Sequence, residues 1–169
     1  YMTPDIDHAA VGDRIMSVGA AFGVIITGAG VFRARRIEAG LLNAGSDFDE
    51  TTTPFAAGLG DFVDFDKGDF IGRTALLDAD RSCRTWGMRT AHGVAQVGDT
   101  ITIDGRLVGS VRATAWSPYL QCGVSIVRMH SAQHGPSTEV SVETVDGGTA
   151  SAVLCTMPFY DEERLIPRG

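Results

Sequence analysis

The chain has 169 residues, of which 44% are hydrophobic and 21% are charged, and its formal net charge is -7 at pH 7. This length and composition are ordinary for a globular protein with one large or two small cores, and they argue against a disordered chain. The negative charge and the isoelectric point near 4.9 repel phosphate backbones, which argues against nucleic acid as a partner. The longest apolar run, around Val18 to Ile26, is too short to span a bilayer, so no membrane is expected as a partner.

The cysteine content favours a reduced, cytoplasmic protein. Cys83, Cys122 and Cys155 lie far apart without a C-x-x-C spacing, and their odd number leaves at least one outside any disulfide. No secretory signal or transit segment is recognisable. Cys122 and Cys155 lie in apolar runs, where a thiol behaves as a small hydrophobe, and we expect both to pack in a core.

The N-terminal part predicts one helix and then less regular elements. From Asp5 to about Ala21, apolar residues recur at mostly helical offsets, which predicts a helix on one face of a sheet. Residues 24–26 form a strand or a loop, and they lead through glycines into an element over residues 31–39 whose type stays ambiguous.

An acidic stretch follows these elements. Residues 47–69 carry seven acidic residues against one lysine, so we expect this segment to lie largely exposed. Four apolar residues are its expected anchors, namely Phe55, Leu59, Phe62 and Phe65.

From Arg84 onward the pattern becomes that of short strands. Residues 100–103 alternate in polarity, Asp104-Gly105 is a favoured two-residue hairpin turn, and residues 107–111 alternate back. Further strands are predicted over residues 122–127, 139–145 and 149–154. Several short strands with close turns predict a small antiparallel barrel or sandwich over about 82–165.

Four ordered motifs between Arg36 and Arg73 make the middle of the chain the most informative part. They are RIEAG at 36–40, DETTTP at 49–54, AGLG at 57–60 and KGDFIGR at 67–73. This series resembles the RLEAG, D-x-x-T-x-P, AGLG and K-x-DFIGR series of the glycine cleavage T-protein family, which are folate-dependent aminomethyltransferases. Four matches in order are far more specific than one short motif.

A second block carries the same resemblance near the C-terminus. Residues 108–111 (VGSV), 116–118 (WSP) and 158–161 (PFYD) look like the "VGxVTSGxxSP … PFYD" series of the family. Members of the family are more than twice as long, and their N-terminal half supplies a catalytic aspartate and a pterin-binding segment. The chain therefore looks like the C-terminal portion of such a protein, and no catalytic residue is assigned within it.

The resemblance implies both a fold class and a function. We expect an α+β protein, with the C-terminal part of a folate-binding α+β domain over residues 1–78 and a small antiparallel β-barrel domain over residues 82–165. The intact protein would be a one-carbon transferase that uses tetrahydrofolate and a small methyl or aminomethyl donor, with a lipoyl carrier protein as a further partner. This chain alone would be inactive.

The candidate folate-binding residues are Arg33, Arg36, Glu38 and Asn43. A guanidinium can bind a carboxylate of the folate tail bidentately, and a carboxylate can accept two parallel donors from an aminopyrimidine. Glu38 could instead form an internal salt bridge with Arg35 or Arg36. The spacing of two between Arg36 and Glu38 favours a strand or turn, in which both lie on one side.

Two departures from the family leave alternatives open at this site. Phe32 occupies the position of the folate-tail arginine of the family, and Ala44 replaces a bulky pocket aromatic. Either Arg33 takes over the tail contact or this protein binds another ligand or places folate differently. The alternative function is that of a non-enzymatic folate-binding module, as in the related iron–sulfur assembly proteins. Those proteins have a cysteine at the position of Asp69, so the aspartate favours the transferases.

Two further patterns point to no additional chemistry. His130 and His134 are four residues apart, as metal ligands on a helix can be, but a Gly-Pro pair follows at once and no third ligand is evident. We therefore assign no metal. Ser117 and Ser125 lack the nucleophile turn and the paired base of a hydrolase.

Overall fold

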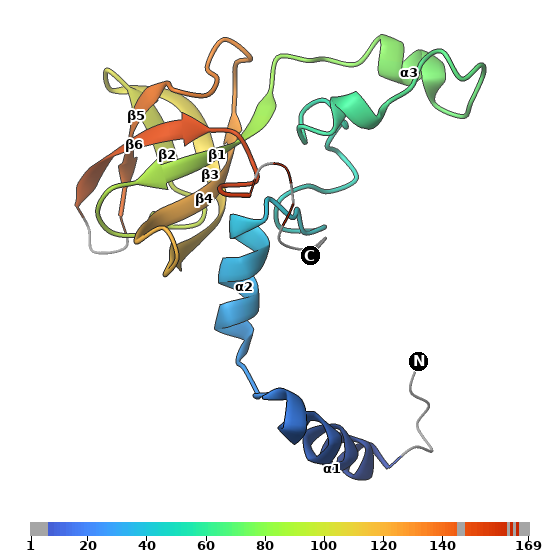
Figure 1. Ribbon diagram of the computed structural model, residues 1–169. Helices are drawn as coiled ribbons and strands as arrows, with labels where there is room; N and C mark the ends of the chain where they lie inside the picture. Colours follow the sequence, from blue (N-terminus) through green and yellow to red (C-terminus); the bar gives the residue numbers. More distant parts are fainter. Residues whose placement is uncertain (1–6, 145–147, 162, 164, 166–169) are drawn as a thin grey trace. The chain divides into compact units, whose positions relative to one another are not determined.

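The computed structural model describes residues 7–144, 148–161, 163 and 165, and Figure 1 shows its elements. Contacts group the chain into two units, residues 1–31 and residues 32–169. The helical elements are α1 (His8–Gly19), η1 (Ala20–Phe22), α2 (Ala29–Glu38), η2 (Gly60–Phe62) and α3 (Arg73–Leu77). The strands are β1 (Arg84–Thr90), β2 (Thr100–Ile103), β3 (Arg106–Ser117), β4 (Cys122–Met129), β5 (Glu139–Glu143) and β6 (Thr149–Cys155).

The predicted N-terminal helix is present as α1, and its expected place on one face of a sheet stays a prediction. It begins after Asp7, whose side chain accepts hydrogen bonds from the backbone N–H groups of Ala9 and Ala10 at 3.1 and 3.0 Å. These bonds satisfy donors that the first turn of a helix leaves free. Residues 24–28 form no regular element, so 24–26 is a loop rather than a strand. No helix in the described ranges is long and apolar enough to cross a bilayer.

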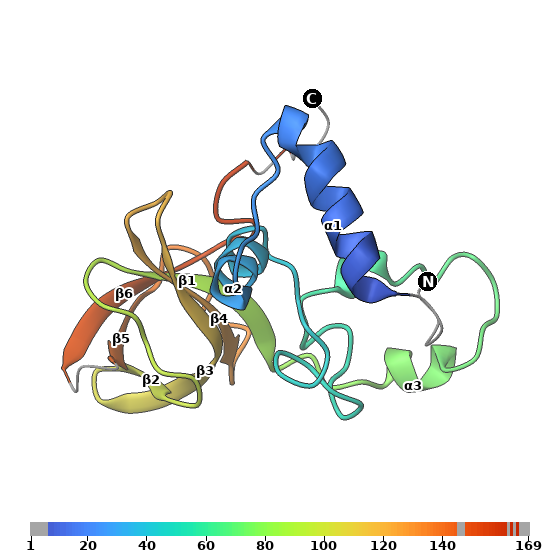
Figure 2. The same ribbon diagram turned by 90° about the horizontal axis from the view of Figure 1, so that it is seen from below.

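The C-terminal strands close into an antiparallel barrel in the order β1-β4-β3-β2-β5-β6 (Figures 1 and 2). This architecture confirms the predicted α+β class with a C-terminal barrel. The predicted hairpin is also confirmed, because Ile103 pairs with Arg106 across the turn. Asp104 and Gly105 both have positive φ, 49° and 74°, as a type I′ turn requires.

Two apolar clusters hold the barrel and its neighbours together. The interior cluster contains the fully buried Met88, Ile101, Val127, Met129 and Leu154 together with smaller residues. The second cluster lies on the outer face of the barrel and joins α2 to it. Its buried members are Ile37, Ala113, Val124, Ile126 and Phe159. Because burial of large apolar side chains contributes about 1.5–3 kcal/mol each, Ile37 fixes the end of α2 against the barrel.

The extents of several strands differ from the predictions. The strand predicted over residues 107–111 continues to Ser117 as β3, and β4 continues beyond Val127 to Met129. In both cases pairing between β3 and β4 extends the strand beyond the predicted end, with one register shift between Val111 and Ala113. The predicted strand 139–145 ends at Glu143 in the structure, and position 145 lies outside the described residues.

The acidic segment 47–69 is mostly exposed, as predicted, but its anchors differ. Phe55 and Phe65 are half-buried, with ring centroids 6.4 Å apart, whereas Phe62 is 83% exposed and Leu59 is also exposed. Asp47, in contrast, is buried. The composition of the segment describes its average exposure and does not identify the one carboxylate that tertiary contacts bury.

The cysteines are less buried than predicted. All three are half-buried, and Cys122 and Cys155 pack against the edge of the outer cluster rather than inside the barrel. Burial raises the pKa of the Cys122 thiol, which keeps it protonated at neutral pH.

Candidate functional site

The RIEAG sequence forms the last turn of α2 and its cap. Leu41 donates its N–H to the carbonyl of Arg36 at 2.8 Å, and Gly40 donates to the carbonyl of Ile37 at 2.9 Å. This is the Schellman arrangement, in which a residue with positive φ follows the helix, and Gly40 has φ 67°. The glycine of the motif is therefore the stop signal of the helix.

The prediction of a strand or turn at Arg36 and Glu38 was wrong. Both residues lie in α2, where a spacing of two places side chains on different faces. A spacing of three brings helical side chains together, so Glu38 meets Arg35 instead. The two candidates consequently belong to two separate networks.

The first network surrounds the carboxylate of Glu38, which is completely buried. Arg35 donates from Nη1 to Oε2 at 2.9 Å, and the buried Ser117 donates from its hydroxyl to Oε1. The hydroxyl of Tyr160 lies 3.5 Å from Oε2 and accepts from Arg35 at 2.8 Å. Both oxygens of Glu38 are thus engaged within the chain, as a buried carboxylate requires.

The Glu38 network joins three parts of the chain that are distant in sequence. Ser117 ends β3, and it also accepts the N–H of Leu120 at 3.0 Å. Tyr160 follows Phe159, whose N–H donates to the carbonyl of Glu38 at 2.9 Å. Burial raises the pKa of Tyr160, and the adjacent Glu38 adds to this effect. The hydrogen bond to Glu38 raises the pKa of Arg35.

The second network surrounds the buried carboxylate of Asp47. Arg36 donates from Nη1 to Oδ2 at 2.7 Å, and the backbone N–H of Asn43 donates to the same oxygen at 2.8 Å. Ser46 donates its hydroxyl to Oδ1 at 2.9 Å. The side chain of Arg36 is mostly buried, so its guanidinium pairs with Asp47 rather than facing solvent.

Asn43 and Arg33 are the exposed candidates. The amide of Asn43 donates to the hydroxyl of Ser46 at 3.1 Å and its side chain is accessible. Arg33 is exposed on α2, and so is Phe32, which is 73% exposed. Of the four predicted residues, Arg36 and Asn43 therefore lie together in the Asp47 network. Glu38 belongs to the other network, and Arg33 belongs to neither of the two.

Sequence reasoning missed several residues of these networks as site residues, namely Ser46, Asp47, Ser117 and Tyr160. Ser117 and Tyr160 belong to the WSP and PFYD motifs, which were the available signal. Asp47 has no comparable signal, because it is one of seven acidic residues in its segment.

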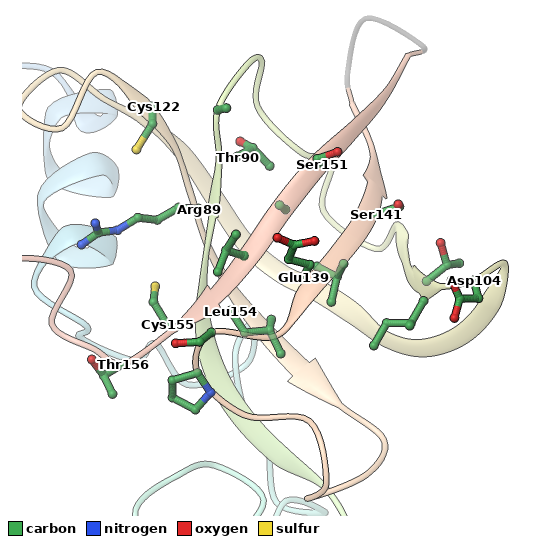
Figure 3. A pocket seen from close by; sticks show the side chains of 18 residues that line it. Arg89, Thr90, Asp104, Cys122, Glu139, Ser141, Ser151, Leu154, Cys155 and Thr156 are labelled. Carbon is green, nitrogen blue, oxygen red and sulfur yellow. The ribbon is translucent and has the colours of Figure 1, made fainter.

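An open groove of about 1040 Å³ runs over the outer face of β5 and β6 (Figure 3). Arg89, Cys122 and Cys155 lie at one end of it and Asp104 at the other. Arg89 donates from its guanidinium to the carbonyl of Phe159, so this end borders the outer cluster. None of the four predicted folate residues lines the groove.

The histidine pair shows no metal geometry. His130 follows β4 and His134 lies in the next loop, where its carbonyl accepts the indole N–H of Trp86 at 3.0 Å. Within the described ranges, no group of three or more histidine, cysteine or acidic side chains is arranged to hold a metal ion.

Two family models match the chain in sequence order. Residues 2–67 match the GCVT N-terminal domain, and residues 84–161 match the glycine cleavage T-protein C-terminal barrel domain. The second match covers the barrel described above, and the first contains the RIEAG turn and the Asp47 network.

Individual relatives agree with these matches. An aminomethyltransferase from Nostoc sp. is 37% identical over 145 residues, covering 82% of this chain and 38% of that protein. A trimethylamine-oxide aldolase from Ruegeria pomeroyi is 33% identical over 170 residues, covering 96% of this chain and 22% of that protein.

A solved structure has the same fold. The crystal structure of glycine cleavage system aminomethyltransferase T from Bartonella henselae superposes with a TM-score of 0.78 at 23% identity, over 92% of this chain and 44% of that one. The chain spans less than half the length of each of these three proteins. With both domain models matched in order and relatives aligned across most of its length, the chain belongs to the glycine cleavage T-protein (aminomethyltransferase) family.

Proposed function

We propose that this chain is the C-terminal part of a tetrahydrofolate-dependent one-carbon transferase. Residues 1–78 then complete a folate-binding domain and residues 82–165 form its barrel domain. The observation that carries the proposal is the ordered match to both family domains, combined with the buried Glu38 network that fastens the RIEAG turn to the barrel. The intact protein binds tetrahydrofolate and a small methyl or aminomethyl donor, and we place it in the cytoplasm.

Catalysis in this proposal rests on orientation and electrostatics. A donor and tetrahydrofolate held in reacting geometry need no covalent intermediate on this chain. Arg33 supplies the charge for a folate carboxylate, since its guanidinium is exposed and makes no ion pair with the described residues. Arg36 and Glu38 act as positioning residues that fix the turn next to the ligand, and Asn43 contributes a polar contact from the same loop.

The names of the relatives describe two reactions for the donor. One relative is an aminomethyltransferase, for which a lipoyl carrier protein is the matching partner, and another is an aldolase of trimethylamine oxide. Both belong to the proposed class, in which a one-carbon unit leaves a nitrogen compound. A non-enzymatic folate-binding module is the competing function, and it differs by binding folate without transferring carbon.

The test compares the 169-residue chain with the longer protein of which it forms part. Calorimetric titration with tetrahydrofolate should show no submicromolar site on the chain alone and a saturable site on the longer protein. Incubation of the longer protein with a methylamine or glycine-derived donor should convert tetrahydrofolate to its one-carbon adduct. Binding without conversion of any donor would favour the non-enzymatic module, and tight binding by the chain alone would refute the proposed division of the site.

Arg33→Gln in the longer protein examines the carboxylate contact. Loss of a charged hydrogen bond costs about 1.5–3 kcal/mol, so the affinity should fall by about tenfold or more. Arg106→Gln is the matched control, because Arg106 is an exposed arginine at the start of β3. Equal effects of the two substitutions would remove Arg33 from the site.

A further inference from the structure

Asn43 and Asp47 close a short loop after α2. The backbone N–H of Asn43 donates to Oδ2 of Asp47 at 2.8 Å, and the N–H of Asp47 donates back to the carbonyl of Asn43 at 3.0 Å. Gly45 also donates its N–H to the carbonyl of Phe48 at 2.7 Å. Residues 43–48, the Asn43 loop, are therefore held together by their own hydrogen bonds. A contact that fixes Asp47 consequently fixes Asn43 as well.

Asp47 is held from two sides. Its carboxylate accepts from Arg36 near the end of α2 at 2.7 Å, and its backbone carbonyl accepts from Nη2 of Arg128 on β4 at 2.7 Å. Among the hydrogen bonds of the described residues, the bond from Arg128 is the one that connects the Asn43 loop to a strand of the barrel. The place of the loop relative to the barrel therefore depends on the guanidinium of Arg128.

The guanidinium of Arg128 is itself fixed by a second strand. Its neighbours Val127 and Met129 belong to the interior cluster, so the side chain of Arg128 faces outward. Arg128 is paired with Thr85 across the ladder between β1 and β4, and its Nε donates to the hydroxyl of Thr85 at 3.1 Å. That hydroxyl donates to the carbonyl of Ala56 at 2.7 Å. Because two nitrogens of one planar group are engaged, its orientation is set, and a lysine with a single nitrogen could not keep both contacts.

The side-chain amide of Asn43 is the exposed end of these contacts. It donates to the hydroxyl of Ser46 at 3.1 Å and remains accessible to solvent. We propose that Arg128 is a positioning residue, which ties the Asn43 loop to β4 and thereby sets where the Asn43 amide meets the ligand. The inference rests on the proposed function, in which Asn43 contacts tetrahydrofolate. Arg128 acts through Asp47 and Asn43 and makes no contact with the ligand itself.

A double-mutant cycle in the longer protein tests this role. Asn43→Ala removes one neutral hydrogen bond to the ligand, so the affinity for tetrahydrofolate should fall by about three- to tenfold. Arg128→Lys keeps the charge and loses the contact with Asp47 or with Thr85, and it should weaken binding by a similar factor. Because both changes act through one amide, the double variant should bind like Asn43→Ala alone. A general structural role of Arg128 predicts additive losses instead, and additive losses would overturn the proposal.

Hydrogen exchange in the 169-residue chain provides a readout without ligand. Arg128→Lys should speed exchange of the Asn43 and Asp47 amides by about tenfold or more, because the loop loses a hydrogen bond from a charged donor. The amides of β1 and β4 should keep their rates. Arg106→Lys is the matched control, since Arg106 is exposed at the start of β3, and it should change neither exchange nor affinity. Unchanged exchange at Asn43 and Asp47 in the Arg128→Lys chain would refute the placement of the loop by Arg128.

The two measurements separate this inference from the proposed function. If the longer protein binds no tetrahydrofolate, the proposed function fails, and exchange at Asn43 and Asp47 alone decides whether Arg128 places the loop. If it binds tetrahydrofolate and Arg128→Lys leaves the affinity unchanged, the proposed function stands and the positioning role is wrong. Circular dichroism checks folding, and Arg128→Gln replaces Arg128→Lys in both measurements if the lysine variant does not fold.

Discussion

Glu38→Gln tests whether the glutamate of the RIEAG turn stabilises the fold or contacts the ligand. The change preserves shape and removes the charge from a side chain that is completely buried. An amide can still accept from the hydroxyl of Ser117, but it accepts more weakly than a carboxylate. It also directs donor hydrogens at Arg35, which has only donors to offer.

The expected loss follows from the two partners. The side chain of Arg35 is 60% exposed, so its ion pair with Glu38 is screened and contributes about 0–1 kcal/mol. The hydrogen bond from Ser117 is buried at both ends and involves a charged acceptor, which contributes about 1.5–3 kcal/mol. Because the amide retains part of the second contact, we expect a net loss of about 1–2 kcal/mol. For a chain of this size that lowers the melting temperature by about 2–8 °C.

Differential scanning calorimetry of the chain measures this change, and Glu50→Gln is the matched control because Glu50 is exposed. Ser117→Ala should cost a similar amount. The double variant should cost less than the sum of the two, since both substitutions affect the same hydrogen bond between Ser117 and Glu38. In the longer protein, affinity for tetrahydrofolate separates the two roles. Unchanged stability with weakened binding would refute the structural interpretation, and lost stability with unchanged binding would remove Glu38 from the ligand contacts.

Two further predictions concern the contacts between the end of α2 and residues 157–160. Gly40→Ala should destabilise the chain by more than Gly45→Ala, because both have positive φ, 67° and 88°, but only at Gly40 would a Cβ lie 2.8 Å from the side chain of Met157. Left-handed backbone costs about 1–2 kcal/mol at either site, so equal losses in urea unfolding would contradict the predicted contact. Tyr160 has a raised pKa in the folded chain, so its contribution to stability is complete below the unfolded pKa of about 10 and is lost as the pH rises through the folded value. Tyr160→Phe should therefore make the melting temperature decline less steeply above pH 10. An unchanged dependence of the melting temperature on pH would contradict this role of Tyr160.

The barrel was the most predictable part of the structure. Alternation over residues 100–111 and the Asp104-Gly105 turn depend on local chemistry, since a type I′ turn needs two residues that tolerate positive φ. The full length of β3 could not be predicted, because its last residues are held by the ladder to β4 and by the outer cluster. The pattern of polar and apolar residues along the chain does not show which distant residues will pair with a strand.

The candidate site was predictable as a set of residues and not as an arrangement. The ordered motifs between Arg36 and Arg73 determined the family, because their residue types and order are properties of the sequence alone. Only the tertiary structure decided that Arg36 pairs with Asp47 and Glu38 with Arg35 and Ser117. Helical geometry separates residues two apart, and burial of a carboxylate depends on donors that arrive from distant strands, so neither pairing could be read from spacing along the chain.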